Sequence, residues 1–183
     1  VYKRQILVGI LAAAGQLSQK RLRKAAFLGE LSLTGQLRAV AGVLPMALCA
    51  RRMGVEALYV PADNAPEATL ADGLTVYPVR DVTELAAHLS GDVVLSPAPV
   101  WTPGLPTHAG PDFAEVKGQE QVKRALEVAA AGGHHILMAG SPGAGKSMLA
   151  RRLPSILPDL TRQEALACTE IYSVMGLTSK DEP

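Results

Sequence analysis

Aromatic residues and cysteines are scarce in this chain. Its 183 residues include two Phe, four Tyr, one Trp and two Cys, so a hydrophobic core has to be built mainly from aliphatic side chains. The cysteines, Cys49 and Cys168, lie far apart, which excludes a disulfide-rich secreted domain and a zinc site made from Cys pairs. Because both lie in segments that contain Ala and Leu, we expect them to be small core residues in a reducing compartment.

The chain also lacks a long hydrophobic segment. Its longest apolar run, residues 6–14, is too short to cross a membrane, which takes about 20 residues. Lys3 and Arg4 precede this run as in a signal peptide, but residues 15–17, Gly-Gln-Leu, offer no convincing cleavage site. We therefore expect a cytoplasmic protein without a membrane partner.

Signatures of several enzyme classes are absent. There is no G-x-S-x-G segment of a serine hydrolase and no Cys/His spacing of a metal site. His134 and His135 are adjacent, and neighbouring side chains of a strand point to opposite faces, so we expect both to be structural. His88 and His108 have no partners in the sequence. These absences leave a glycine-rich segment as the main candidate for chemistry.

That segment is a phosphate-binding loop motif. Residues 140–147 read Gly-Ser-Pro-Gly-Ala-Gly-Lys-Ser, which matches G-x-x-x-x-G-K-[ST] at every fixed position. Before it, the apolar residues 135–139 predict a buried strand; after it, residues 148–153 predict a helix that Pro154 ends. Strand, glycine-rich loop and helix are the context in which this motif binds a nucleoside triphosphate with Mg²⁺.

The role of each residue in the loop follows from the motif. Glycines let the backbone approach phosphate, and successive N–H groups from Gly143 to Ser147 converge on its oxygens. Lys146 is placed to reach the β- and γ-phosphates and is the predicted catalytic residue, and the Ser147 hydroxyl is the predicted Mg²⁺ ligand. The predicted nucleotide-binding residues are Gly140, Ser141, Pro142, Gly143, Ala144, Gly145, Lys146, Ser147 and Met148.

Periodicity and turn residues predict the remaining elements. Strands are expected at residues 27–33, 36–40, 55–60 and 74–79, with the first two forming a hairpin around Thr34 and Gly35. Helices are expected at residues 6–14, 46–53, 82–89 and 119–131, with Pro45 at a first helical position and Asp81 as a cap. Thr161 and Glu164 form a capping-box pattern that predicts a further helix.

Composition divides the chain in two. Residues 91–113 carry five prolines with scattered Gly and Thr, which is typical of an interdomain linker, and we expect Trp101 to anchor it on a neighbouring domain. The predicted domains are residues 1–90 and 114–183. We also expect the chain to be part of a longer protein, because it does not start with Met and stops soon after the phosphate loop.

Residues 114–160 resemble the magnesium-chelatase-like AAA+ ATPases of the YifB/ComM family, on the lead-in to the loop and on the Met148–Pro158 segment after it. In this family, the turn matched by Gly118-Gln119-Glu120 runs past the nucleotide base. The resemblance implies an ATPase that uses ATP and Mg²⁺. It also implies that the Mg²⁺-binding carboxylates and the arginine finger lie beyond Pro183, so that this fragment alone is expected to bind ATP.

Residues 29–79 resemble the proteolytic domain of Lon, through Gly29–Gly35, Val40–Val43, Ala47–Arg52 and Pro61–Asn64. Lon proteases carry a catalytic Lys after the Gly-Gly turn, and that position is Leu44 here. Since Leu cannot act as a general base, we expect a protease-shaped domain without protease chemistry. The expected fold class is α/β, with the opening of an AAA+ P-loop NTPase domain preceded by a smaller α+β Lon-protease-like domain.

The resemblance implies a ring oligomer, hexameric in form, that acts on DNA as a branch-migration helicase of natural transformation. Two alternatives stay open: a magnesium-chelatase-type ATPase that drives metal insertion into a porphyrin, and a non-enzymatic nucleotide-gated binding module. The basic cluster of Lys20, Arg21, Arg23 and Lys24 is compatible with nucleic-acid contact, but a solvated loop is the preferred interpretation. Arg151 and Arg152 are interpreted as surface charge or as contacts to a neighbouring subunit.

Overall fold

The chain folds into two units. The computed structural model describes residues 3–15, 17, 22–102 and 110–178, and we describe each unit by itself. The first unit combines Val1–Pro103 with Arg162–Pro183, and the second consists of Gly104–Thr161. The sequence prediction kept residues 114–183 together. The structure instead groups helix α8 (Arg162–Val174) with the first unit, because α8 packs on helix α3 (Val43–Arg52).

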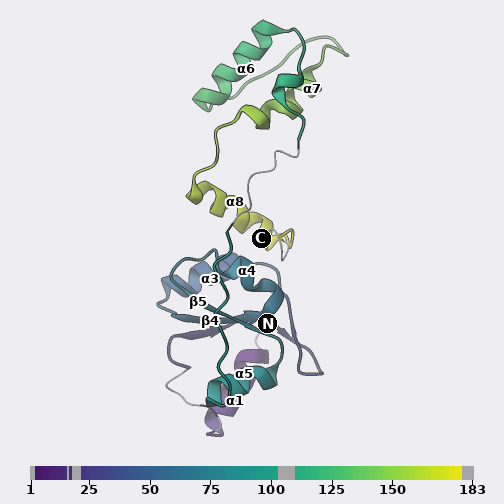
Figure 1. Ribbon diagram of the computed structural model, residues 1–183. Helices are drawn as coiled ribbons and strands as arrows, with labels where there is room; N and C mark the ends of the chain where they lie inside the picture. Colours follow the sequence, from purple (N-terminus) through teal and green to yellow (C-terminus); the bar gives the residue numbers. More distant parts are fainter. Residues whose placement is uncertain (1–2, 16, 18–21, 103–109, 179–183) are drawn as a thin grey trace. The chain divides into compact units, whose positions relative to one another are not determined.

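A three-stranded parallel sheet forms the centre of the first unit (Figure 1). Its order is β1 (Ala25–Phe27), β4 (Ala57–Pro61) and β5 (Thr75–Val79), and Leu58 of β4 lies opposite Ala26 and Val76. The central strand β4 is almost entirely buried, as expected for a parallel strand covered on both faces. The strands expected at residues 55–60 and 74–79 are thus confirmed within two residues.

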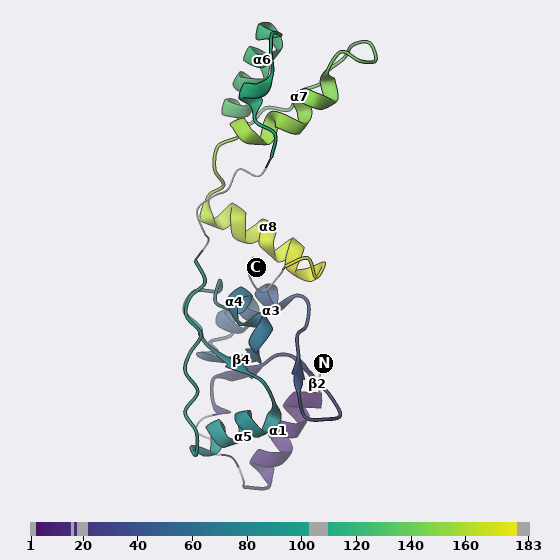
Figure 2. The ribbon, with the colours of Figure 1, turned by 45° about the vertical axis from the view of Figure 1, so that its right-hand side comes forward.

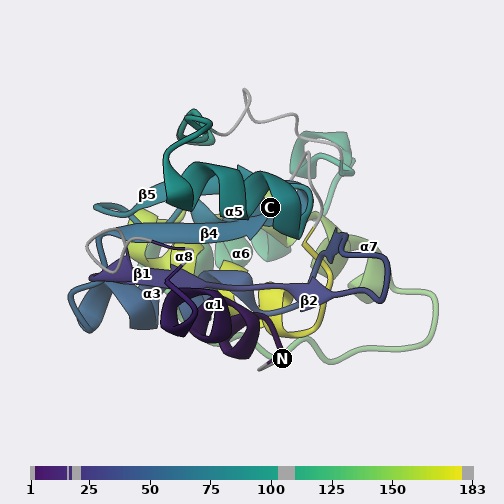
Figure 3. The same ribbon diagram turned by 90° about the horizontal axis from the view of Figure 1, so that it is seen from below.

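Helices cover both faces of this sheet (Figure 2). Leu58 and Val60 face α3 and the short helix α4 (Ala65–Ala68), where they form a core with Val43, Leu44, Ala47, Ala65, Ala68, Ala71 and Val76. Tyr59, on the opposite face of β4, joins a second core with helices α1 (Lys3–Ala13) and α5 (Val82–Ser90). Figure 3 shows α1 and α5 on this second face. The alternation along β4 therefore divides the aliphatic side chains between two cores.

Several of the few aromatic residues are concentrated in the second core. Tyr59 stacks between Phe27 and Tyr77, with ring centroids 5.0 and 5.1 Å apart. The Nε2 atom of His88 lies 3.2 Å from the Tyr59 hydroxyl, and the Leu95 N–H donates to His88 Nδ1 at 3.0 Å. Because Nδ1 accepts this bond, the imidazole proton sits on Nε2. His88, which has no partner in the sequence, is thus a structural residue that fixes the chain after α5.

The expected hairpin exists in shorter form. Strand β2 (Glu30–Leu31) pairs antiparallel with β3 (Leu37–Arg38), and Gly35 has a φ of +84° in the turn between them. Phe27, expected in the same strand as Glu30, belongs instead to β1. Gly29, with a φ of +128°, turns the chain between the two sheets. One predicted strand therefore divides at a glycine.

Two expectations about individual residues have clear outcomes. The Asp81 carboxylate accepts a hydrogen bond from the Glu84 N–H at 2.8 Å, which confirms it as the cap of α5. Cys49 and Cys168 are both exposed, so their assignment to the core is wrong. Cys49 lies on α3 away from Val43, Leu44 and Ala47, which form the buried side of that helix. Apolar neighbours in the sequence, such as Ala and Leu, therefore do not show which face of a helix a cysteine occupies.

The second unit is built from helices and turns: η2 (Phe113–Glu115), α6 (Glu120–Gly132), α7 (Lys146–Arg152) and η3 (Leu153–Ile156). Its core consists of Phe113, Val116, Leu126 and Leu149. The strand expected at residues 135–139 is not formed, and Leu137 there is 93% exposed. A strand needs a hydrogen-bonded neighbour, and no described segment pairs with these residues. Within the described residues, no helix combines the length and apolar character needed to cross a membrane.

Candidate nucleotide-binding site

The phosphate loop is held in place by the core of the second unit. Leu149, three residues into α7, is 1% exposed and packs with Phe113, Val116 and Leu126. Farther along, Arg152 pairs with Glu115 at 2.8 Å. From the sequence, Arg152 is expected to be surface charge or a contact to a neighbouring subunit. In the structure its side chain forms an ion pair within its own unit. These contacts fix the helix that begins with the lysine of the motif.

Two glycines of the loop adopt left-handed backbone conformations. Gly143 has a φ of +81° and Gly145 a φ of +82°, values that cost other residues energy. Gly145 is also the N-cap residue of α7. A Cβ at Gly145 would lie 3.2 Å from the Gln119 amide nitrogen and 3.5 Å from the Met148 methyl carbon. The loop therefore favours glycine at this position mainly for its conformation, because both neighbouring atoms are the ends of flexible side chains.

The side chain of Lys146 folds back over the loop. Its Nζ donates to the carbonyl oxygens of Gly140 at 2.9 Å and Ser141 at 2.8 Å. Both acceptors are neutral, and the side chain is only partly buried. The ammonium group is therefore held at the centre of the loop, where a phosphate oxygen would be a stronger acceptor.

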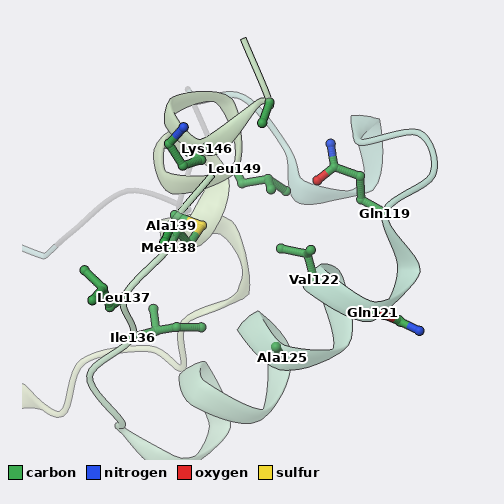
Figure 4. Close-up of a pocket in the computed structure, with 11 residues that line it drawn as sticks. Gln119, Gln121, Val122, Ala125, Ile136, Leu137, Met138, Ala139, Lys146 and Leu149 are labelled. Atoms are coloured by element: carbon green, nitrogen blue, oxygen red, sulfur yellow. The ribbon is translucent and has the colours of Figure 1, made fainter. Parts of the chain in front are cut away.

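A cavity of about 410 Å³ opens beside Lys146 (Figure 4). One side comes from α6 and its N-cap residue Gln119, and the opposite side from the extended segment Ile136–Ala139, as Figure 4 shows. The lining is mostly apolar, with Gln119, Gln121 and Lys146 as its polar members. Its residues are Gln119, Gln121, Val122, Ala125, Ile136, Leu137, Met138, Ala139, Ala144, Lys146 and Leu149.

The structure brings only part of the predicted site to this cavity. Ala144 and Lys146 line it, whereas the rest of the predicted set lies along the exposed loop and the start of α7. The exposed Ser147 is the predicted metal ligand. Among the residues that the structure describes, no group of three His, Cys, Asp or Glu side chains is arranged to hold a metal ion.

Sequence reasoning missed the α6 side of the cavity. Val122 and Ala125 lie in the helix expected at residues 119–131 and follow its apolar periodicity, yet both line the cavity. Val122 is 37% exposed. The periodicity therefore identified an apolar stripe on the helix, but not that part of this stripe is exposed to solvent. Gln119 has a φ of +59°, which is uncommon for a residue other than glycine. Only the resemblance indicated that this turn lies near a nucleotide.

Two family models match the chain. The model described as "Magnesium chelatase, subunit ChlI" matches residues 112–183, and the model described as "Subunit ChlI of Mg-chelatase" matches residues 2–64. Between them, the two models cover the phosphate loop and two strands of the parallel sheet, β1 and β4.

Individual relatives match over nearly the whole chain. An uncharacterised protein of Mycobacterium tuberculosis is 45% identical over 183 residues, which is 100% of this chain and 36% of the relative. Competence protein ComM of Haemophilus influenzae is 38% identical, over 93% of this chain and 34% of ComM. The uncharacterised protein YifB of Escherichia coli is 38% identical, over 97% of this chain and 35% of YifB. The chain thus spans about a third of the length of these relatives.

A more distant match is to a protease. The Lon protease of Magnetococcus marinus is 36% identical over 93 residues, which is 45% of this chain and 11% of that protease. The match agrees with the sequence resemblance to Lon. The chain is thus similar in two segments to the family models of magnesium chelatase subunit ChlI, and over most of its length to ComM and YifB.

Proposed function

We propose that residues 140–147 bind the phosphates of ATP, and that this chain is the nucleotide-binding part of an AAA+ ATPase. The observation that carries the proposal is the loop itself: Gly143 and Gly145 are left-handed, and Lys146 stands beside an apolar cavity. A flat heteroaromatic base suits a cavity of about 410 Å³ with few polar groups. Phosphates suit an exposed glycine-rich loop with a lysine at its centre.

Lys146 is the residue we propose to contact the β- and γ-phosphates. In the structure its ammonium has two neutral carbonyl acceptors, those of Gly140 and Ser141. Exchange of these for charged phosphate oxygens gives stronger hydrogen bonds, since bonds between two charged groups are about twice as strong as neutral ones. The lysine is already in place, so binding requires only a short movement of its side chain.

Ser147 is the proposed Mg²⁺ ligand within this chain. Bound Mg²⁺ would neutralise charge on the β- and γ-phosphates, which is the chemistry that the ion supplies in phosphoryl transfer. The Ser147 side chain is exposed at the start of α7, where a hydroxyl can reach an ion beside the loop. We propose that the carboxylates and the arginine finger needed for hydrolysis come from parts of the ATPase that this chain does not contain.

For the whole protein we propose an ATP-driven homo-oligomeric ring, hexameric, that acts on DNA. The support is similarity to ComM, which is named as a competence protein, over 93% of this chain. A second candidate is an ATPase that drives metal insertion into a porphyrin. Its support is the description of both matching family models, which name a subunit of magnesium chelatase. Similarity to ComM extends over 93% of this chain, whereas each chelatase model matches fewer than half of its residues, and we therefore favour the DNA-processing candidate.

ATP hydrolysis by the full-length protein separates these candidates. We expect branched DNA to raise the rate of phosphate release and a porphyrin with its partner subunits to leave it unchanged. The reverse result would support the chelatase candidate. A nucleotide-gated binding module predicts tight ATP binding with no turnover under either condition, and this outcome would reject the ATPase proposal.

A further inference from the structure

Helix α3 starts in the interior of the first unit without a capping side chain of its own. Its N-cap residue is Gly42, and Val43 and Leu44 in its first turn are fully buried. The first N–H groups of a helix have no partner inside it and need one elsewhere. Pro45 has no N–H, and among the other groups at this end the N–H groups of Gly42 and Leu44 have partners outside the helix.

Glu67 of α4 supplies the missing cap. Its Oε1 accepts the Leu44 N–H at 2.9 Å, although Glu67 is only 4% exposed. A carboxylate at the N-terminus of a ten-residue helix is favoured by the helix dipole. Asn64, one turn earlier, binds both the N–H and the carbonyl of Val40 at 3.0 Å, which fixes the segment leading into α3.

The remaining partners come from the end of α8, more than 100 residues later in the chain. The Ser173 hydroxyl donates to Glu67 Oε1, and the Ser173 carbonyl accepts the Gly42 N–H at 2.9 Å. Thr178 donates to the second oxygen of Glu67 at 3.3 Å. Ser173 is fully buried, whereas its neighbours Tyr172 and Val174 are exposed. The small polar side chain of Ser173, rather than its larger neighbours, thus makes the contact.

The other end of α8 is also attached to the first unit. Arg162 Nη2 contacts both carboxylate oxygens of Asp72, at 2.6 and 2.7 Å, and Leu166 packs against the α3–α4 core. The ion pair is exposed and screened by water, so it contributes little. The buried hydrogen bonds of Ser173 are therefore the stronger polar contacts between α8 and the rest of the first unit.

We infer that the surface formed by residues 39–44, Asn64, Glu67 and Asp72 is an intramolecular docking site for α8. The second unit, which carries the phosphate loop, connects to the first unit at both of its ends, and α8 is the segment that follows it. Docking completes the cap of α3 and removes the Glu67 charge from water in a fully hydrogen-bonded setting. The inference holds whether or not the loop binds ATP.

An engineered disulfide tests the docked position. An ideal Cβ at Gly176 lies 3.6 Å from the Ala41 Cβ, within the range of about 3.5–4.5 Å found in disulfides. In the full chain with Cys49 and Cys168 replaced by Ser, the pair Ala41→Cys and Gly176→Cys should form a disulfide with oxidised glutathione, which is reduced to two glutathione thiols. The product is recognised by loss of both free thiols in the intact-mass spectrum after alkylation.

The matched control is Gly54→Cys with Gly176→Cys. Gly54 has a φ of +79°, close to the +68° of Gly176, and its Cβ would have no neighbour within 4 Å. Cross-linking of the Ala41 pair at least about tenfold faster than the control supports docking. Equal rates for the two pairs would overturn the inference.

Hydrogen exchange tests the role of the hydroxyl. Ser173→Ala raises helix propensity, so on propensity alone the amides of α8 should exchange their hydrogens more slowly. Loss of a buried bond to a charged carboxylate should instead make the α8 amides exchange about tenfold or more faster, with the amides of β4 unchanged. Thr169→Ala, which removes a hydroxyl bonded only within α8 to Ala165, is the control and should leave α8 protected. Unchanged protection in Ser173→Ala would refute the docking site.

Discussion

Substitution of Gly145 by Ala tests the geometry of the phosphate loop. The residue has a φ of +82°, and a left-handed conformation costs a residue with a Cβ about 1–2 kcal/mol. The new Cβ would also lie 3.2 Å from the Gln119 amide nitrogen, which the flexible end of that side chain has to accommodate. If the loop relaxes to avoid this cost, ATP binding has to restore the left-handed form. We therefore expect affinity to fall about 5- to 30-fold.

Gly133→Ala is the control for this experiment. Gly133 has a φ of +61° at the C-cap of α6, and a Cβ there would meet nothing within 4 Å. Alanine at Gly133 has a backbone cost similar to that of alanine at Gly145, but Gly133 lies outside the cavity. The Gly133→Ala variant should therefore unfold more easily and bind ATP with unchanged affinity. Titration calorimetry with ATP and Mg²⁺ gives both affinities. The reasoning is refuted if Gly145→Ala binds like the unmodified protein, or if both variants lose affinity equally.

Three further predictions concern the surrounding structure. Leu149→Ala should lower the free energy of unfolding of the second unit by about 2–5 kcal/mol in urea, because it leaves a cavity where a side chain is 1% exposed; a loss below about 1 kcal/mol would contradict this. Asp81→Ala removes the acceptor of the Glu84 N–H and should lower stability by about 1 kcal/mol in the same assay. His88→Phe keeps the ring but leaves the Leu95 N–H without its acceptor, so exchange of that amide should accelerate; unchanged exchange would argue against the bond.

Local patterns in the sequence predicted the elements whose cause is local. The loop at residues 140–147 and the Asp81 cap depend on residues a few positions apart, and the strands at 57–61 and 75–79 show as short apolar runs. The two ChlI models and the relatives ComM and YifB agree with the family resemblance of the chain. In these cases the chemistry of a segment and its structure are determined by the same few residues.

The sequence could not predict features that depend on distant partners. Residues 135–139 are apolar enough for a strand, but a strand forms only against a neighbour, and none of the described segments provides one. The burial of Ser173 depends on Glu67, 106 positions earlier. Leu44, where the Lon resemblance places a lysine, is fully buried with its N–H bonded to Glu67, so an ammonium group there would be costly. Long-range contacts of this kind leave no periodic trace.

ATP binding by a variant of Lys146 tests the central claim most directly. Lys146→Ala removes the ammonium group that bridges the Gly140 and Ser141 carbonyls, and Lys117→Ala, at an exposed position outside the cavity, is the matched control. A hydrogen bond to a charged group contributes about 1.5–3 kcal/mol. Titration calorimetry with ATP and Mg²⁺ should therefore show affinity about 10- to 100-fold weaker for Lys146→Ala and unchanged for Lys117→Ala. Equal affinities for both variants would contradict the assignment of residues 140–147 as the nucleotide site.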